Sequence, residues 1–231
     1  MKISEKTLQI LKNYATINQG IVVDVGNILK TVATTKTTYS ECMVEEKFEK
    51  PFSIYDLNDF LSILSNFEDP EITFYDSYLK IYSDNTKGTG KYFYGSKDII
   101  EHPETTPKVP DKEFNLKINK DDLSNVLKMS NVFQLDELVL TYDGKKVEIG
   151  AVNSSNPVSN SYFLVLSESN ESNLKPFDIY FRKDTLKILP SDYDIIISQK
   201  MVSGLRIATF KSDVDNIIYH VAIEDHSKFG I

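Results

Sequence analysis

The sequence predicts an α+β fold built from two similar domains, each with two helices packed on a mainly antiparallel sheet. The first observation is a repeat, because KPFSIYDLNDFLSIL begins at Lys50 and KPFDIYFRKDTLKIL begins at Lys175, with nine identities in fifteen positions. The second is a series of short, turn-bounded stretches in which apolar residues alternate, as in strands. The third is EHPETTPKVPDKE at 101–113, whose three prolines and lack of apolar periodicity indicate a linker. Together they predict domains at 1–109 and 110–231.

The first half begins with a predicted helix over 4–17, with Ser4 as N-cap and with Leu8, Leu11 and Ala15 on one apolar face. Strands are expected at 21–25, 28–33 and 37–41, the first two separated by Gly26-Asn27. The first copy of the repeat then predicts an extended stretch leading into a helix over 55–67, whose buried stripe is Leu57, Phe60, Leu61 and Leu64. Alternation within 71–83 and 91–94 predicts further strands.

The second half follows the same plan. A strand at 113–118 leads to a helix over 119–132 with Asn119 as its cap, and strands at 138–142 and 145–150 are joined by the hairpin signal Asp143-Gly144. A strand at 162–166 precedes the second copy of the repeat, which predicts a helix over 181–189. The last strands are expected at 193–198, 205–210 and 217–223. Two short helices cannot cover both faces of a sheet, so the other face is expected to be solvated or paired with another subunit.

Composition excludes several classes of protein. No stretch approaches the roughly 18 apolar residues of a membrane span, and the first residues lack the apolar run of a signal peptide, so we expect a soluble cytosolic protein without membrane partners. Cys42 is the single cysteine, which excludes an intramolecular disulfide and a cysteine-based zinc site. The 26 basic and 34 acidic residues give a net charge of -8, so binding DNA would require segregating positive charge onto one face.

No motif indicates a catalytic, metal or cofactor site. TKGTGKYF contains GTGK, but Asn85 and Tyr92 stand where a phosphate-binding loop needs Gly and Ser or Thr. His102, His220 and His226 lack metal-ligand spacing, and the acidic pairs are typical of a solvated acidic surface. The 13 tyrosines and 13 phenylalanines could stack on bases, but at alternating strand positions cross-strand packing is the default.

Three segments carry a family resemblance: MKISEKTLQILKNYATINQGI, IYDLNDFLSILS and LPSDYDIIIS. They resemble the sliding clamps of T-even type bacteriophages, which are DNA polymerase processivity factors, and the resemblance spans nearly the whole chain, most strongly residues 1–66. It implies a DNA clamp fold and a homotrimeric ring whose helices line a central hole around duplex DNA. It further implies a protein that is not an enzyme, needs no cofactor and works in the cytoplasm of the infected host cell.

A central hole would place basic helix residues next to DNA. Away from the first helical turns, where carboxylates favour the helix dipole, the candidates are Lys12, Lys128, Arg182, Lys183 and Lys187, and Lys6 is added because it shares the polar face of the first helix with Lys12. Lys12 and Lys128 occupy matching positions in the two halves, and Lys183 and Lys187 are four residues apart on one predicted helical face. Spacing alone favours ordinary solvated lysines, and the resemblance reverses this preference for Lys12 and Lys128.

The resemblance also implies partners. The C-terminal peptide of the polymerase and the ATP-driven clamp loader are expected to bind an apolar groove near the linker and second domain, for which we select Val109, Pro110, Val132 and Phe133; these could equally be ordinary core. A role in late transcription is also implied. Ring closure should pair an edge strand of each half with one from the next subunit. The candidates are Lys91, Tyr92, Phe93 and Tyr94 with Tyr162, Phe163, Leu164, Val165 and Leu166, unless these strands are internal to their sheets.

Two other classes of function remain open at this point. The duplicated domain could serve a non-catalytic, β-rich scaffold or interaction module that does not encircle DNA. A hydrolase with carboxylate chemistry is the third alternative, and it is disfavoured because no nucleophile, metal cluster or cofactor loop was found.

Overall fold

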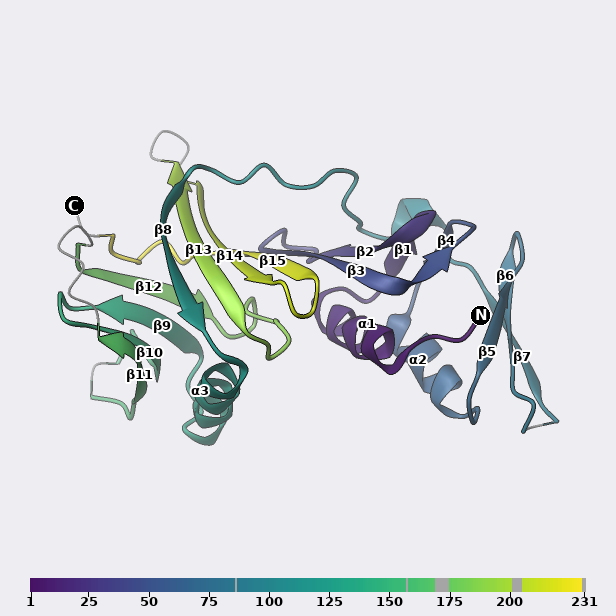
Figure 1. Cartoon of the computed structure of the whole chain (residues 1–231), viewed down its shortest axis with the longest axis horizontal. Helices are drawn as coiled ribbons and strands as arrows, with labels where there is room; N and C mark the ends of the chain where they lie inside the picture. Colours follow the sequence, from purple (N-terminus) through teal and green to yellow (C-terminus); the bar gives the residue numbers. More distant parts are fainter. Residues whose placement is uncertain (86, 157, 169–174, 201–204, 230–231) are drawn as a thin grey trace. The chain divides into compact units, whose positions relative to one another are not determined.

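The computed structural model describes residues 1–85, 87–156, 158–168, 175–200 and 205–229. The chain divides into two compact units, Met1–Thr106 and Pro107–Ile231, whose helices and strands are labelled in Figure 1. The division falls within the segment expected to be a linker, where residues 101–111 form no helix or strand. The predicted α+β class is confirmed, because both units combine helices with antiparallel sheets.

The described residues of the first unit form two α-helices. Its elements are α1 (Glu5–Ile17), β1 (Ile21–Val23), β2 (Gly26–Val32), β3 (Thr38–Phe48), β4 (Phe52–Ile54), α2 (Leu57–Ser65), β5 (Glu71–Phe74), β6 (Tyr78–Tyr82), β7 (Thr89–Phe93) and the 3₁₀ turn η1 (Lys97–Ile99). α1 begins as predicted, because the Ser4 side chain accepts a hydrogen bond from the N–H of Thr7 at 3.2 Å.

The buried face of α1 is rotated from the predicted one. Its buried residues are Thr7, Ile10, Leu11, Tyr14 and Ile17. Of the predicted stripe, Leu11 is buried, but Leu8 and Ala15 are only half-buried at one margin of the face. Tyr14 lies at the centre, and its hydroxyl is 3.0 Å from the Ser40 hydroxyl on β3. The predicted stripe did not include Tyr14, although its ring is fully buried.

A buried carboxylate attaches the start of α1 to the sheet. Glu46 on β3 accepts hydrogen bonds from the backbone N–H of Ser4 and from Thr7 Oγ1, the latter at 2.6 Å. Burial acts to raise the pKa of Glu46, but these hydrogen bonds to the charged form outweigh it and hold the pKa below its ordinary value. The charged carboxylate therefore fixes the position of the first turn of α1.

α2 agrees closely with its sequence signals. Asp56 is its N-cap, accepting from the N–H of Asp59 at 2.9 Å, and the helix packs against α1. The four predicted stripe residues, Leu57, Phe60, Leu61 and Leu64, are buried. The opposite face is left to solvent.

The strands on either side of Gly26-Asn27 belong to different pairings. β1 pairs with β4, while β2 pairs with β3. Gly26 has φ +125°, a conformation that favours glycine, and it bends the chain between the two pairings. The remaining strands form a separate sheet in the order β5-β6-β7.

The second unit contains one α-helix in its described residues. Its elements are β8 (Lys112–Ile118), α3 (Lys120–Val132), β9 (Glu137–Tyr142), β10 (Lys146–Val152), β11 (Tyr162–Glu168), β12 (Phe177–Arg182), β13 (Tyr193–Lys200), β14 (Leu205–Ser212) and β15 (Ile217–Ala222). α3 begins at its predicted cap, where Asn119 accepts from the N–H of Asp122 at 2.8 Å. It buries Leu123, Val126 and Ser130.

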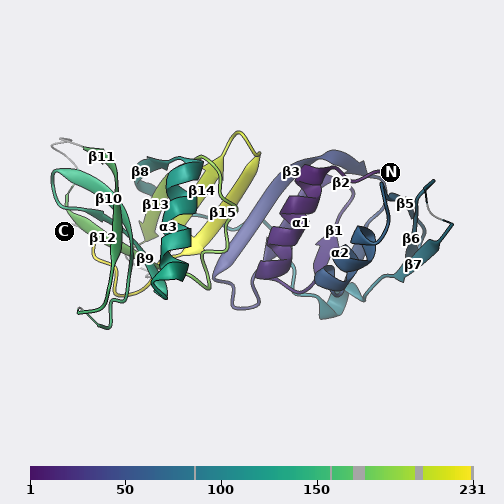
Figure 2. The same cartoon turned by 90° about the horizontal axis from the view of Figure 1, so that it is seen from below.

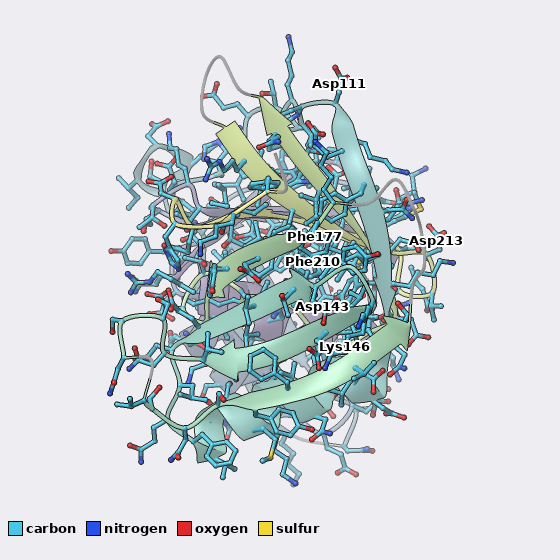
Figure 3. The ribbon with its side chains drawn as sticks, turned by 90° about the vertical axis from the view of Figure 1, so that its left-hand side faces the viewer. Asp111, Asp143, Lys146, Phe177, Phe210 and Asp213 are labelled. Atoms are coloured by element: carbon cyan, nitrogen blue, oxygen red, sulfur yellow. The ribbon has the colours of Figure 1, made fainter. Side chains whose placement is uncertain are left out.

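Two antiparallel arrays make up the second unit, one in the order β11-β10-β9-β12 and the other including β15-β14-β13-β8. The predicted hairpin at Asp143-Gly144 joins β9 and β10, with Gly144 at φ +96° and the Asp143 carboxylate accepting from the N–H of Lys146. Figure 3 shows this side of the unit, with Phe177 and Phe210 behind the strands that face the viewer. Both rings are buried, so apolar side chains from the two arrays form the core.

The predicted helix over 181–189 is wrong. The chain continues as strand β12 through Arg182 and then makes a single turn, in which the N–H of Leu186 bonds the Arg182 carbonyl at 2.9 Å. In the aligned repeat, Phe181 replaces the capping Asp56, and Pro190 replaces Ser65. The second copy therefore lacks the N-cap, and its proline opposes helical backbone just before it. The nine identical positions of the repeat therefore predict the strand of the second copy correctly, but they do not determine that a helix follows it.

The two units nevertheless share strand pairings. Ile21 on β1 lies opposite Ile54 on β4, and Leu140 on β9 lies opposite Ile179 on β12. In each unit a thirteen-residue helix immediately precedes the first strand of this pair: α1 precedes β1, and α3 precedes β9. The sequence repeat therefore corresponds to a repeated architecture.

Candidate functional site

The solvent-facing side of α1 carries an exposed lysine. Figure 2 shows α1 and α2 side by side in the first unit, in agreement with their packing. Glu5, Gln9, Lys12 and Thr16 are exposed on α1, opposite the buried Tyr14. Lys12 forms no ion pair within the described residues, so its charge remains available to an anion. Lys6 lies at the margin of this face and is half-buried.

The solvent-facing side of α3 is similar. Asn125, Lys128 and Val132 are exposed along it, and Val126 is buried on the other side. Lys128 likewise makes no ion pair within the part of the chain that the structure describes. The acids Asp121 and Asp122 lie in the first turn, where they favour the helix dipole. Lys128 therefore supplies positive charge to this face of α3, beyond the acidic first turn.

α2 differs from the other two helices. Its exposed residues are Asn58, Asp59, Ser62 and Ser65. None is basic, so α2 presents hydroxyl and amide groups with one carboxylate. Any attraction of the first unit for phosphate through its helices therefore depends on α1.

The other three predicted DNA-facing residues have a different setting. Arg182 ends β12 and is paired with Asp184 through Nη2 at 2.9 Å, and Lys183 Nζ donates to the Leu135 carbonyl at 3.2 Å. Arg182 and Lys183 border a polar cleft of about 570 Å³ that Glu137 and His226 also line. Lys187 follows the turn. Because no helix forms here, Lys183 and Lys187 do not share a helical face.

The candidate assembly strands both lie at sheet edges, which removes the alternative that they are internal. β7 is at one edge of the β5-β6-β7 sheet, and β11 is at one edge of the β11-β10-β9-β12 sheet. Large apolar side chains are exposed on both, with Phe93 67 %, Phe163 44 % and Val165 50 % exposed. Such edges favour pairing with another chain.

The aromatic side chains of these edges are held in place. The Tyr92 hydroxyl donates to the Asp56 carbonyl at 3.2 Å, and its ring packs edge-on against Phe60 at 5.4 Å. Phe163 lies across Gly150, where an added Cβ would be 2.5 Å from the ring. Each edge strand therefore presents an ordered surface.

The four residues chosen for a peptide groove are not brought together. Val109 and Pro110 precede β8, whereas Val132 and Phe133 end α3, which begins only after β8. A seven-residue strand is about 23 Å long, and Figure 1 shows α3 at the end of β8 remote from the linker. Val132 is exposed and Phe133 half-buried, so Val132 does not belong to the core.

A hollow in the first unit was missed by sequence reasoning. It has a volume of about 180 Å³ and is lined by Val25, Ile28, Lys30, His102 and Pro103 among others. Val25 is 62 % exposed, and Ile28 lies opposite the exposed Met43 across the β2–β3 pair. In the sequence, this surface is indicated by Val25 and Ile28, the apolar residues on either side of Gly26-Asn27. It was missed because Gly26-Asn27 was interpreted as a turn between strands. The bend at Gly26 places the apolar Val25 and Ile28 in one hollow with the charged Asp24 and Lys30.

Neither a metal-ligand cluster nor a membrane-spanning helix occurs in the described residues. No group of three or more His, Cys, Asp and Glu side chains there could hold a metal ion. Within the same ranges, no helix is long and apolar enough to cross a bilayer. Cys42 is buried and unbridged.

Comparisons with known proteins identify relatives along the chain. The family model described as DNA polymerase processivity factor matches residues 2–92. The sliding clamp of Escherichia phage RB69 is 32 % identical over 236 residues, covering 98 % of each chain. The sliding clamp of Enterobacteria phage T4 is 30 % identical over 237 residues, with the same coverage.

Solved structures agree on the fold. One chain of the PCNA2–PCNA3 complex from Sulfolobus tokodaii has a TM-score of 0.68 at 12 % identity, covering 97 % of this chain and 99 % of that one. PCNA from Entamoeba histolytica has a TM-score of 0.67 at 13 % identity, covering 96 % and 97 %. At these identities the likeness concerns the fold, whereas the phage relatives establish descent. This chain therefore belongs to the family of bacteriophage sliding clamps, the processivity factors of DNA polymerases.

Proposed function

We propose that three copies of this chain close into a ring around duplex DNA and tether the replicative polymerase, without catalysing a reaction. The observation that carries the proposal is the presence of two features in one chain: helices whose outward lysine makes no ion pair with the described residues, and exposed apolar strands at sheet edges. Family membership supports it. A closed ring cannot leave duplex DNA without opening, so contacts with the DNA can be weak and still permit retention.

Lys12 and Lys128 are the DNA-facing residues that we propose. Lysine contacts phosphates without reading the sequence, which suits a protein that must pass over any duplex. Lys6 is a secondary candidate because it is half-buried at the margin of α1. Arg182, Lys183 and Lys187 are not included, because their argument required a helix and Arg182 is already paired with Asp184.

Ring closure is proposed to pair β7 of one copy with β11 of the next. Each strand has one neighbour in its own sheet and a free edge, so a second chain would supply the missing backbone hydrogen bonds. Pairing would also cover Phe93, Phe163 and Val165, which are exposed in the single chain. With two units in each subunit, three subunits arranged head to tail would present six similar units to the duplex.

Polymerase and loader are proposed to dock through short peptides at the hollow beside Val25 and Ile28, in place of the groove selected from the sequence. Its lining is mixed: Val25 and Ile28 suit an apolar peptide side chain, and the polar and charged groups beside them, among them Asp24 and Lys30, suit the peptide's polar groups. The same surface would serve a partner in late transcription. All of this would occur in the cytoplasm of the infected host cell.

The test is retention on DNA of different topology. Protein loaded on a nicked circular plasmid should remain bound through gel filtration, and cutting the circle once should release it. A monomeric interaction module that binds by contact alone would be retained equally on circular and linear DNA. Equal retention would therefore refute encirclement.

A further inference from the structure

One hydrogen bond joins the outward face of α3 to the edge strand β11. Asn125 Nδ2 donates to the Tyr162 hydroxyl, with 2.9 Å between the atoms. Asn125 is exposed, three residues before Lys128 on the solvent-facing side of the helix. Tyr162 is the first residue of β11, and α3 packs against that strand. The bond therefore connects the proposed DNA-facing surface with the proposed subunit interface.

Besides this bond, β11 is held by its pairing with β10, by packing against α3 and by the Phe163 ring lying across Gly150. Among the described residues the strand pairs only with β10, and its register shifts between Val147 and Glu148 on that neighbour. None of its described side chains from Tyr162 to Ser167 is fully buried. One edge of the strand is free, and the Tyr162 hydrogen bond lies at its first residue, so this bond bears on where the strand begins.

Asn125 can bind two partners at once. A side-chain amide nitrogen carries two N–H groups, and one of them is used by Tyr162. The other can donate to an anion beside Lys128. A phosphate bound there would polarise the amide and strengthen its bond to the tyrosine, because hydrogen bonds in a chain reinforce each other.

We infer that Asn125 and Tyr162 are positioning residues that couple DNA occupancy of the ring to closure of its β11 edge. This inference rests on the proposed function. Phosphate at Asn125 and Lys128 holds the start of β11 in the position that pairs with the next copy. By thermodynamic reciprocity, a closed interface holds Asn125 in the orientation that accepts DNA. The ring is consequently harder to open when duplex is inside it.

The test compares Tyr162→Phe with the wild type, both with and without DNA. This substitution removes only the hydroxyl. Its matched control is Tyr82→Phe on β6, away from the helix faces. That substitution removes a hydroxyl that donates a hydrogen bond to Glu71 at 3.0 Å. Subunit exchange between rings measures opening without DNA, and residence time on a nicked circle measures opening with DNA.

Tyr162→Phe should shorten residence on the circle by about two- to tenfold, as expected for one hydrogen bond, and should change exchange without DNA by a smaller factor. Asn125→Ala should shorten residence at least as much, because it also removes the N–H available to phosphate, and the double variant should match Asn125→Ala alone, because the two residues act as one link. Tyr82→Phe should leave both quantities unchanged.

Equal changes with and without DNA, or no change in either, would overturn the coupling. Fully additive effects of the two substitutions would also overturn it. If the proposed function itself were wrong, the wild type would form no ring and would not be retained preferentially on the circle. The two kinds of failure can therefore be distinguished. A wild type that passes those checks leaves Tyr162→Phe as a test of the coupling alone.

Discussion

Replacing Glu46 with alanine tests how the DNA-facing helix is positioned. The Glu46 carboxylate on β3 accepts from the Ser4 N–H and from Thr7 Oγ1 at the start of α1. Alanine removes both acceptors and leaves the two donors without their partner in a buried site. Because α1 carries Lys12, loosening its first turn would disturb the proposed inner wall of the ring.

The magnitude follows from these two hydrogen bonds. A hydrogen bond to a charged group contributes about 1.5–3 kcal/mol. The two share one carboxylate and one helix end, so they do not add fully, and Ser4 Oγ still caps the Thr7 N–H. We expect Glu46→Ala to lower the free energy of unfolding by about 2–4 kcal/mol.

Equilibrium urea unfolding at neutral pH measures this difference. The control is Glu45→Ala, the exposed neighbour on the opposite face of β3, which should change the free energy of unfolding by about 0.5 kcal/mol or less. A loss for Glu46→Ala no larger than that for Glu45→Ala would refute the reasoning.

The pH dependence provides an independent check. The pKa of Glu46 in the folded protein lies below its ordinary value of 4.5. Its charged form therefore stabilises the fold fully above about pH 4.5, and this contribution is lost as the pH falls through the folded pKa. The gap between wild type and Glu46→Ala should be constant from pH 7 to pH 5 and should narrow below pH 4.5. A gap that widens in acid would contradict the assignment.

Three further outcomes are expected. Lys12→Ala combined with Lys128→Ala should shorten retention on nicked circles and reduce its salt dependence, by up to about five in the log–log slope if six lysines in a trimer each contact a phosphate; unchanged retention would exclude both lysines. Ile28→Asp should weaken binding of a polymerase C-terminal peptide at least tenfold in fluorescence anisotropy, without changing the mass of the assembled protein. An unaltered affinity would exclude the hollow as the peptide-binding site. Val165→Asp should shift sedimentation toward single subunits, because a charge on the β11 edge would be buried on closure, and an unchanged profile would contradict the β7–β11 interface.

Much of the fold was predictable because its signals are local. Ser4 and Asn119 are both found as helix caps, and Asp143-Gly144 forms the expected hairpin. Alternating apolar residues located the strands because each sheet buries one face against the core. The linker was predictable from its prolines.

The misses have physical causes in particular residues. The false helix over 181–189 followed from matching apolar positions, whereas Phe181 in the capping position and Pro190 at the end determine the backbone. The hollow beside Val25 could not be predicted, because the chain bends at Gly26 and the strands on either side of it, β1 and β2, pair with different partners. Pairing partners are non-local, so a single stretch of sequence does not specify them.

Candidate site residues were only partly predictable. Lys12 and Lys128 could be named from helix position, and the structure adds that both are exposed and without an ion pair in its described ranges. Arg182 was named with the same reasoning, but its pairing with Asp184 depends on the turn after β12. The Asn125–Tyr162 hydrogen bond joins residues 37 positions apart, which no periodicity indicates.

The mass of the protein in solution tests the central proposal most directly. One chain has a mass of 26.4 kDa. Sedimentation equilibrium at micromolar concentration should give three times that value, about 79 kDa, for a ring of three subunits. A single species of 26.4 kDa across that range would contradict the proposed ring and, with it, the roles assigned to β7, β11 and the two lysines.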